Sequence, residues 1–164
     1  MDDVFMKRAI ELSRRALSEP GTEPFGAVVV KDGAIVGEGL NHTRARFDPT
    51  SHGEIEAIRD ACRKLECTDL SSCDLYTSCE PCAMCAAAMR IAGIRRLYYA
   101  ASLDQSGRAL GGVSPKVRPR IDAVDLRREV GLPVEERRMP SARLMDADAV
   151  AVLDAWAARC RDHP

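Results

Sequence analysis

CDLYTSCEPCAMCAAAMRIAGIRRLYYAA, residues 73–101, has strand-like ends and a helix-like centre. Residues 73–77 and 95–101 are rich in the apolar and aromatic side chains typical of strands. Pro81 is a favourable first helical residue, and the helix it opens is predicted to reach about residue 92. Two strands joined through a helix pair in parallel, so this stretch predicts an α/β domain.

Upstream of this unit, the sequence predicts two more helices and a β-hairpin. Apolar residues recur at helical spacing over residues 2–17. Residues 27–30 and 34–38 read as strands on either side of a Lys-Asp-Gly turn. A helix over residues 51–65 follows, with Ser51 as its N-cap. The hairpin and the parallel pair together predict a mixed sheet covered by helices on both faces.

Downstream, residues 102–164 form a more variable segment. No repeat or linker interrupts the chain, so we expect a single domain over residues 1–164, with a core of residues 1–101. In order, the segment is expected to be irregular over residues 103–119, helical over 121–130, extended around 134–138 and helical over 147–159.

Composition narrows the class of protein. The 164 residues are 46% apolar and 30% charged, which supports one packed core and excludes a mainly disordered chain. The net charge of −1 argues against a strongly basic nucleic-acid-binding protein. No apolar run has the length of a membrane span, and the charged N-terminus lacks the apolar centre of a secretion signal, so we expect no membrane partner and a cytoplasmic location. Seven cysteines, an odd number, then read as thiols or metal ligands.

Three residues form a candidate metal site. His52 lies at the start of one predicted helix, and Cys82 and Cys85 lie in the first turn of another. The spacing of three places both sulfurs on one helix face, and the helix N-terminus favours thiolates. Two thiolates and one imidazole suit Zn²⁺, and the absence of an evident fourth protein ligand favours a catalytic site, which keeps one position for water.

Glu54 is the candidate catalytic residue. It follows His52 by two positions, which can bring its carboxylate close to the metal without ligating it. A carboxylate there can take a proton from water, deliver it to a substrate nitrogen and then to a leaving amine. Each fragment alone also has a structural interpretation: Ser51 and Glu54 fit a capping box, and Cys-x-x-Cys fits a redox pair or two core thiols. The combination H-x-E followed by P-C-x-x-C instead matches the signature of zinc nucleobase deaminases.

Residues 52–54 (HGE) and 81–85 (PCAMC) resemble the cytidine deaminase-like superfamily, and the resemblance extends from about residue 5 to residue 101. It implies a three-layer α-β-α fold with a five-stranded mixed sheet, one zinc per active site and a homodimer. It also implies that His52, Cys82 and Cys85 bind the zinc and that Glu54 shuttles the proton.

Within that superfamily the chain looks like bacterial guanine deaminase. The resemblance implies that Asn41 contacts the substrate base and that Phe25 forms a pocket wall. Three features depart from the pattern, and one is that residues 161–164 (RDHP) lack the family's aromatic C-terminal tail. Gly53 replaces the usual Ala and resembles fungal cytosine deaminase, and residues 110–116 (LGGVSPK) lack the acidic residues from which a second proton shuttle would come. The matching stretches are residues 24–33 (PFGAVVVKDG), 48–52 (DPTSH), 75–82 (LYTSCEPC) and 134–140 (VEERRMP).

Three functions follow as hypotheses. The first is hydrolytic deamination of a free nucleobase or a related amino-heterocycle, with guanine to xanthine and ammonia as the first choice and cytosine as the pyrimidine alternative. The second is adenosine deamination in transfer RNA, where the same motifs occur. Residues 116–143 hold eight basic and five acidic side chains, a small excess more typical of a solvated face than of a phosphate groove, and the chain has only seven aromatic residues for stacking bases. The third is a zinc-stabilised binding module without activity.

Overall fold

The computed structural model describes residues 2–118 and 121–162. Contacts divide the chain into two compact units, Met1–Arg127 and Arg128–Pro164, and the sheet belongs to the first. The strands are β1 (Glu23–Lys31), β2 (Ala34–Asn41), β3 (Cys73–Cys79) and β4 (Arg96–Ala101). The helices in the described part are α1 (Asp2–Arg14), α2 (Gly53–Leu65), α3 (Ala83–Ile91), α4 (Leu103–Leu110), α5 (Ala123–Val130) and α6 (Asp146–Asp162), with 3-10 helices η1 (Arg15–Leu17) and η2 (Val134–Glu136).

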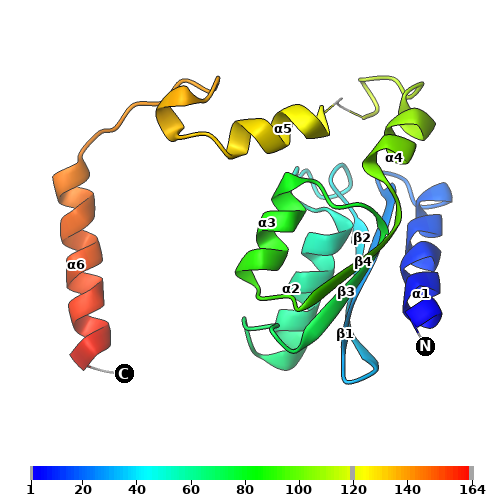
Figure 1. The fold of residues 1–164 in the computed structure, drawn as a ribbon, viewed down its shortest axis with the longest axis horizontal. Coiled ribbons are helices and arrows are strands. Elements are labelled where there is room, and N and C mark those ends of the chain that lie inside the picture. Colours follow the sequence, from blue (N-terminus) through cyan, green and yellow to red (C-terminus); the bar gives the residue numbers. More distant parts are fainter. Residues whose placement is uncertain (1, 119–120, 163–164) are drawn as a thin grey trace. The chain divides into compact units, whose positions relative to one another are not determined.

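The sheet is mixed, as predicted, with the strand order β2-β1-β3-β4 (Figure 1). β1 pairs antiparallel with both β2 and β3, and β3 pairs in parallel with β4. The parallel pair is the one predicted from residues 73–101, with α3 as its crossover. An α/β fold is therefore confirmed, but the sheet of the described residues has four strands rather than five.

The prediction of a fifth strand around residues 134–138 is wrong, because local hydrogen bonds close a turn there. Val134–Glu136 forms the 3-10 helix η2, in which the Glu136 amide donates to the Pro133 carbonyl at 3.0 Å. Arg137 Nε donates back to the Leu132 carbonyl at 2.9 Å. The stretch has adjacent acids and adjacent arginines in place of the alternating pattern that a half-buried strand needs.

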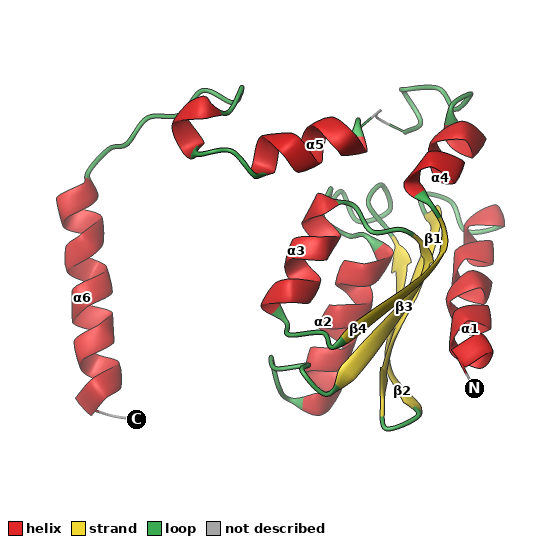
Figure 2. Ribbon diagram, in the orientation of Figure 1, coloured by secondary structure: helices red, strands yellow, loops and turns green. Residues whose placement is uncertain are grey.

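Helices cover both faces of the sheet. α2 and α3 lie on one face and α1 on the other (Figure 2). Successive residues of β1 serve the two sides: Ala27 and Val29 pack in the core with α2 and α3, whereas Val28 and Val30 pack with Leu12 of α1. The site described below lies where α2 and α3 begin.

β2 and α2 approach each other closely because β2 contains two buried glycines, Gly37 and Gly39. A Cβ atom built on Gly39 would lie 2.0 Å from the Gly53 carbonyl oxygen and 2.4 Å from the Ala57 nitrogen. The missing side chains therefore let the helix backbone rest directly on the strand.

Residues 103–110 are helical, contrary to the expected irregular segment. Ser102 Oγ accepts from the Gln105 amide at 3.1 Å, and the Gln105 side chain accepts from the Ser102 amide at 2.8 Å. This reciprocal capping box starts α4.

Over the described residues, no helix combines the length and apolarity needed to cross a membrane.

Candidate metal centre and adjoining pocket

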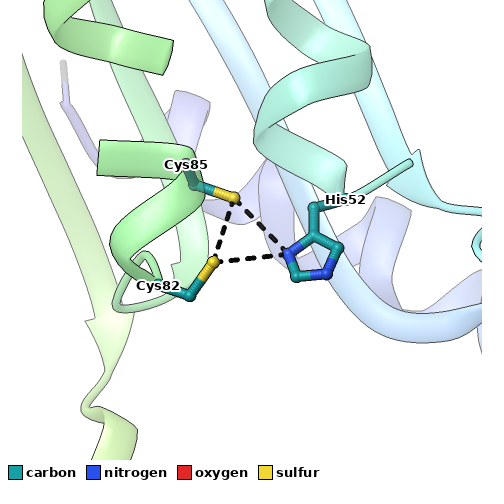
Figure 3. A group of neighbouring side chains, drawn as sticks. All are labelled: His52, Cys82 and Cys85. Atoms are coloured by element: carbon teal, nitrogen blue, oxygen red, sulfur yellow. Dashed lines mark hydrogen bonds between the residues drawn. The ribbon is translucent and has the colours of Figure 1, made fainter. Parts of the chain in front are cut away.

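The three predicted metal ligands lie at the N-termini of two neighbouring helices (Figure 3). His52 is the N-cap residue of α2, and Cys82 is the N-cap residue of α3. Cys85, in the first turn of α3, is fully buried. Pro81 was predicted as the first helical residue, but it precedes the N-cap Cys82 and the helix begins at Ala83.

The spacing of the three ligand atoms fits tetrahedral zinc. Cys82 Sγ lies 3.7 Å from Cys85 Sγ and 3.7 Å from His52 Nδ1, and Cys85 Sγ lies 3.5 Å from His52 Nδ1. Bonds of about 2.3 Å to sulfur and about 2.0 Å to nitrogen, at tetrahedral angles, require separations of roughly 3.8 Å for S–S and roughly 3.5 Å for S–N. Among the described residues, no other group of three or more His, Cys, Asp or Glu side chains brings its ligand atoms this close together. The group could therefore hold a metal ion, and its spacing suits zinc.

The electrostatics of the site favour a thiolate. A hydrogen bond with Cys85 lowers the pKa of Cys82 to about 4, against the opposing effect of burial. The bond to Cys82 raises the pKa of Cys85, and burial acts in the same direction. Both sulfurs lie at the positive end of the α3 dipole, which stabilises negative charge there. Thiolate is the form that zinc binds.

Glu54 lies beside the ligands and faces the pocket. Its side chain is buried, and the Cys85 thiol donates to Glu54 Oε2 at 3.4 Å. Burial raises the pKa of this carboxyl. The capping-box interpretation of Ser51 and Glu54 is wrong, because His52 is the N-cap residue and Ser51 Oγ donates to Glu56 at 3.1 Å.

A cavity of about 70 Å³ opens beside the metal ligands. Its walls include five of the six residues predicted for the site: Phe25, Asn41, His52, Glu54 and Cys82. The sixth, Cys85, is fully buried behind them.

Asn41, at the end of β2, presents hydrogen-bond donors to the pocket. The residue is 1% exposed. Its Oδ1 accepts from the Thr43 amide at 3.1 Å and from Thr43 Oγ1 at 2.9 Å. Because the Thr43 amide can only donate, the acceptor must be the amide oxygen, and the Asn41 NH₂ group is left for a ligand.

The loop between β2 and α2 is tied down by a buried carboxylate, Glu56. It forms ion pairs with Arg46 and Arg59, the latter at 2.8 Å, and accepts from Ser51. Burial would raise the pKa of Glu56, but these hydrogen bonds outweigh it and the pKa is lowered. The network ties the middle of the loop, at Arg46, and its end, at Ser51, to α2, and so holds the residue next to His52.

Five pocket residues were not among the predicted site residues: Cys79, Glu80, Leu103, Ser106 and Arg118. Leu103 and Ser106 belong to α4, which the Ser102–Gln105 capping signature could have revealed. Glu80 accepts from the Leu103 amide at 3.1 Å, so it joins α4 to the loop before α3. Arg118 carried no signal in the sequence.

Comparison with known proteins identifies relatives. Residues 1–101 match the family described as "Cytidine and deoxycytidylate deaminase zinc-binding region". Guanine deaminase of Bacillus subtilis (strain 168) is 37% identical over 94% of this chain and 92% of its own length. Its X-ray structure superposes with a TM-score of 0.83 over 96% of this chain and 94% of that one.

Two other relatives cover less of the chain. The tRNA-specific adenosine deaminase of Agrobacterium fabrum is 44% identical over 66% of this chain and 71% of its own length. The solved structure of the protein NE0047 in complex with 2,6-diaminopurine is 34% identical, with a TM-score of 0.63, and covers 68% of this chain and 61% of that one.

Proposed function

The chain belongs to the cytidine and deoxycytidylate deaminase zinc-binding family, and from that membership we propose that it is a guanine deaminase. It would hydrolyse guanine to xanthine and ammonia. The observation that carries the proposal is the likeness to Bacillus subtilis guanine deaminase, which extends over 94% of the chain and so includes most of the segment after residue 101.

The pocket supports a planar base as substrate. Phe25 offers a flat apolar wall, and Asn41 offers amide donors across the same cavity. Nitrogen and oxygen acceptors on the rim of a purine suit such donors. The complex of the related protein NE0047 with 2,6-diaminopurine shows a purine bound within this family of folds.

Each residue has a role in the proposed reaction. His52, Cys82 and Cys85 hold the zinc, which when bound supplies Lewis acidity that makes water nucleophilic at neutral pH. Glu54 takes a proton from the attacking water and delivers it to N3 of guanine as oxygen adds to C2. Glu54 then takes the remaining proton of the added hydroxyl and passes it to the 2-amino group, so that the C2–N bond breaks, ammonia leaves and the C2 carbonyl of xanthine forms. Phe25 and Asn41 hold the ring in place.

Deamination of adenosine in transfer RNA is the second candidate. It is supported by the 44% identity to the Agrobacterium fabrum enzyme, but that likeness covers only 66% of the chain. The basic residues of the 116–143 segment also argue against it. Four of them pair with acids rather than forming a phosphate groove: Arg118 with Glu23, Arg127 with Glu80, Arg138 with Glu129 and Arg143 with Asp146.

The organisation of the protein forms part of the proposal. We propose that residues 1–164 act as one functional domain, that two copies form a homodimer and that the protein works in the cytoplasm. The exposed apolar side chains Leu153 and Trp156 of α6 support an interface between copies. The thiol ligands support a reducing compartment.

Ammonia release tests the proposed function. Zinc-loaded protein is incubated with guanine, cytosine, adenine, their nucleosides and a tRNA anticodon hairpin, and Glu54→Gln serves as the blank. Turnover of guanine in preference to the others is expected. Turnover confined to cytosine would instead favour the pyrimidine reaction, and turnover confined to the hairpin would favour the RNA reaction.

A further inference from the structure

The pocket contains a cation that the proposed reaction does not use, Arg118. It lines the 70 Å³ cavity beside Glu54 and also an adjoining cavity of about 180 Å³. Its guanidinium carbon lies 5.4 Å from the centre of the Phe25 ring. Arg118 therefore lies over one face of the Phe25 ring, inside the lining of the same pocket.

Glu23 holds this guanidinium in place. Arg118 Nε donates to Glu23 Oε2 at 2.8 Å, and the Glu23 side chain is 15% exposed. Within residues 2–118 and 121–162, Nε is the one guanidinium nitrogen of Arg118 with a recorded hydrogen bond. The terminal NH₂ groups are thus available to a ligand, and the planar fork of the guanidinium gives them a defined direction.

The same network also positions Asn41. Thr43 Oγ1 donates to Asn41 Oδ1 at 2.9 Å and lies 3.5 Å from Glu23 Oε1. Glu23 thus connects the two pocket donors, Asn41 through Thr43 and Arg118 directly. Each side chain is held by one of its own atoms: Asn41 Oδ1 accepts from Thr43, and Arg118 Nε donates to Glu23.

We propose that Arg118 is a specificity-determining residue that donates a hydrogen bond to the ring carbonyl oxygen of a 6-oxopurine, and that Glu23 is its positioning residue. The inference rests on the proposed deamination of guanine. A fixed cationic donor discriminates between bases because it gains a hydrogen bond from a base with O6 and is left unpaired by a base without it.

Two substrates isolate this contact. Guanine and 2-aminopurine carry the same 2-amino group, but 2-aminopurine lacks O6. In Arg118→Met we expect kcat/KM for guanine to fall by about 10- to 100-fold, the effect of losing one charged hydrogen bond. The value for 2-aminopurine should change little. If 2-aminopurine turns over too slowly to measure, its inhibition constant against guanine is compared instead.

Arg95→Met is the matched control, since Arg95 also pairs with a carboxylate, Asp74, at 2.9 Å and lies outside both cavities. It should leave both substrates unchanged. Glu23→Gln should reproduce the guanine-specific loss in weaker form. Zinc content and the unfolding midpoint are measured for each variant.

The outcomes separate the two proposals. Wild-type protein that does not deaminate guanine refutes the proposed function. If the wild-type protein deaminates guanine but Arg118→Met leaves the ratio of kcat/KM for guanine to that for 2-aminopurine unchanged, only the role of Arg118 is overturned. An equal loss on both substrates also overturns it, because it indicates a structural role. If Arg118→Met does not fold, Arg118→Lys, which keeps the charge without the planar fork, should show the same guanine-specific loss.

Discussion

Replacement of Gly39 by Ala should weaken both the fold and the zinc site. The new Cβ atom would lie 2.0 Å from the Gly53 carbonyl oxygen, whereas a tolerable contact needs at least 3.0 Å. The atoms in conflict are backbone atoms of α2, so no side chain can rotate away. β2 and the start of α2 must therefore separate by about 1 Å at this point.

This separation should lower the free energy of unfolding. Overpacking of a well-packed interior costs about 1–3 kcal/mol, and a backbone conflict places Gly39→Ala near the upper end. Lower conformational entropy of the unfolded chain returns about 0.4–1 kcal/mol. We expect the free energy of unfolding to fall by about 2 kcal/mol, which moves the urea midpoint by about 1 M for a chain of this size.

The metal site should respond as well, because Gly53 directly follows His52. Zinc–ligand distances in well-formed sites lie within about 0.2 Å of their usual values, so a shift of α2 should lower the affinity for zinc. Urea unfolding is followed with excess zinc and again with a chelator, which separates the packing cost from the metal contribution.

Gly107 provides the matched control. It lies inside α4, and a Cβ atom built on it meets nothing within 4 Å. Gly107→Ala should raise the free energy of unfolding by up to about 1 kcal/mol, because Ala favours helix over Gly. A Gly39→Ala protein with the wild-type midpoint and full zinc content would refute the argument from close backbone packing.

Three further predictions concern the site and the pH dependence of stability. Glu54→Gln should keep one zinc per chain, measured by atomic emission, while kcat for guanine falls by about 10²- to 10⁴-fold, and unchanged turnover would remove Glu54 from the reaction. Cys82→Ala should lose both zinc and thermal stability, and full zinc occupancy would show that the ligand assignment is wrong. Hydrogen bonds from Arg8 lower the pKa of Glu38 below the ordinary 4.5. The Arg8–Glu38 pair therefore stabilises the fold above pH 4.5, and this stabilisation is lost as the pH falls through the lowered pKa. Glu38→Gln should therefore show a shallower loss of stability below about pH 4.5 in acid-unfolding curves, and an unaltered curve would count against the pair.

The metal ligands could be predicted from the sequence because their geometry is local. A Cys-x-x-Cys at a helix start fixes both sulfurs on one face, whatever the rest of the chain does. The position of His52 relative to them was inferred from the combined motif, and the structure places its Nδ1 within 3.7 Å of both sulfurs. Local chemistry also sufficed for the mixed sheet, because each strand carries its own apolar pattern.

The remaining pocket walls depend on contacts between distant segments. Arg118 reaches the site through Glu23, which lies 95 residues away in the chain. The local sequence around Glu23 and around Arg118 does not predict that pairing. The predicted fifth strand failed for the opposite reason: apolar content at Val134 suggested a strand, but the bonds around Pro133 and Arg137 close a local turn.

Two helix N-termini meet at the proposed zinc site, and this arrangement affects the stability of the protein. The positive ends of α2 and α3 are like poles, and they repel unless negative charge lies between them. A metal held by His52, Cys82 and Cys85 would also cross-link positions 30 residues apart, much as a disulfide would. Withdrawal of zinc therefore releases a chain closure as well as a cofactor. Under zinc shortage, catalytic capacity and resistance to proteolysis should therefore decline together.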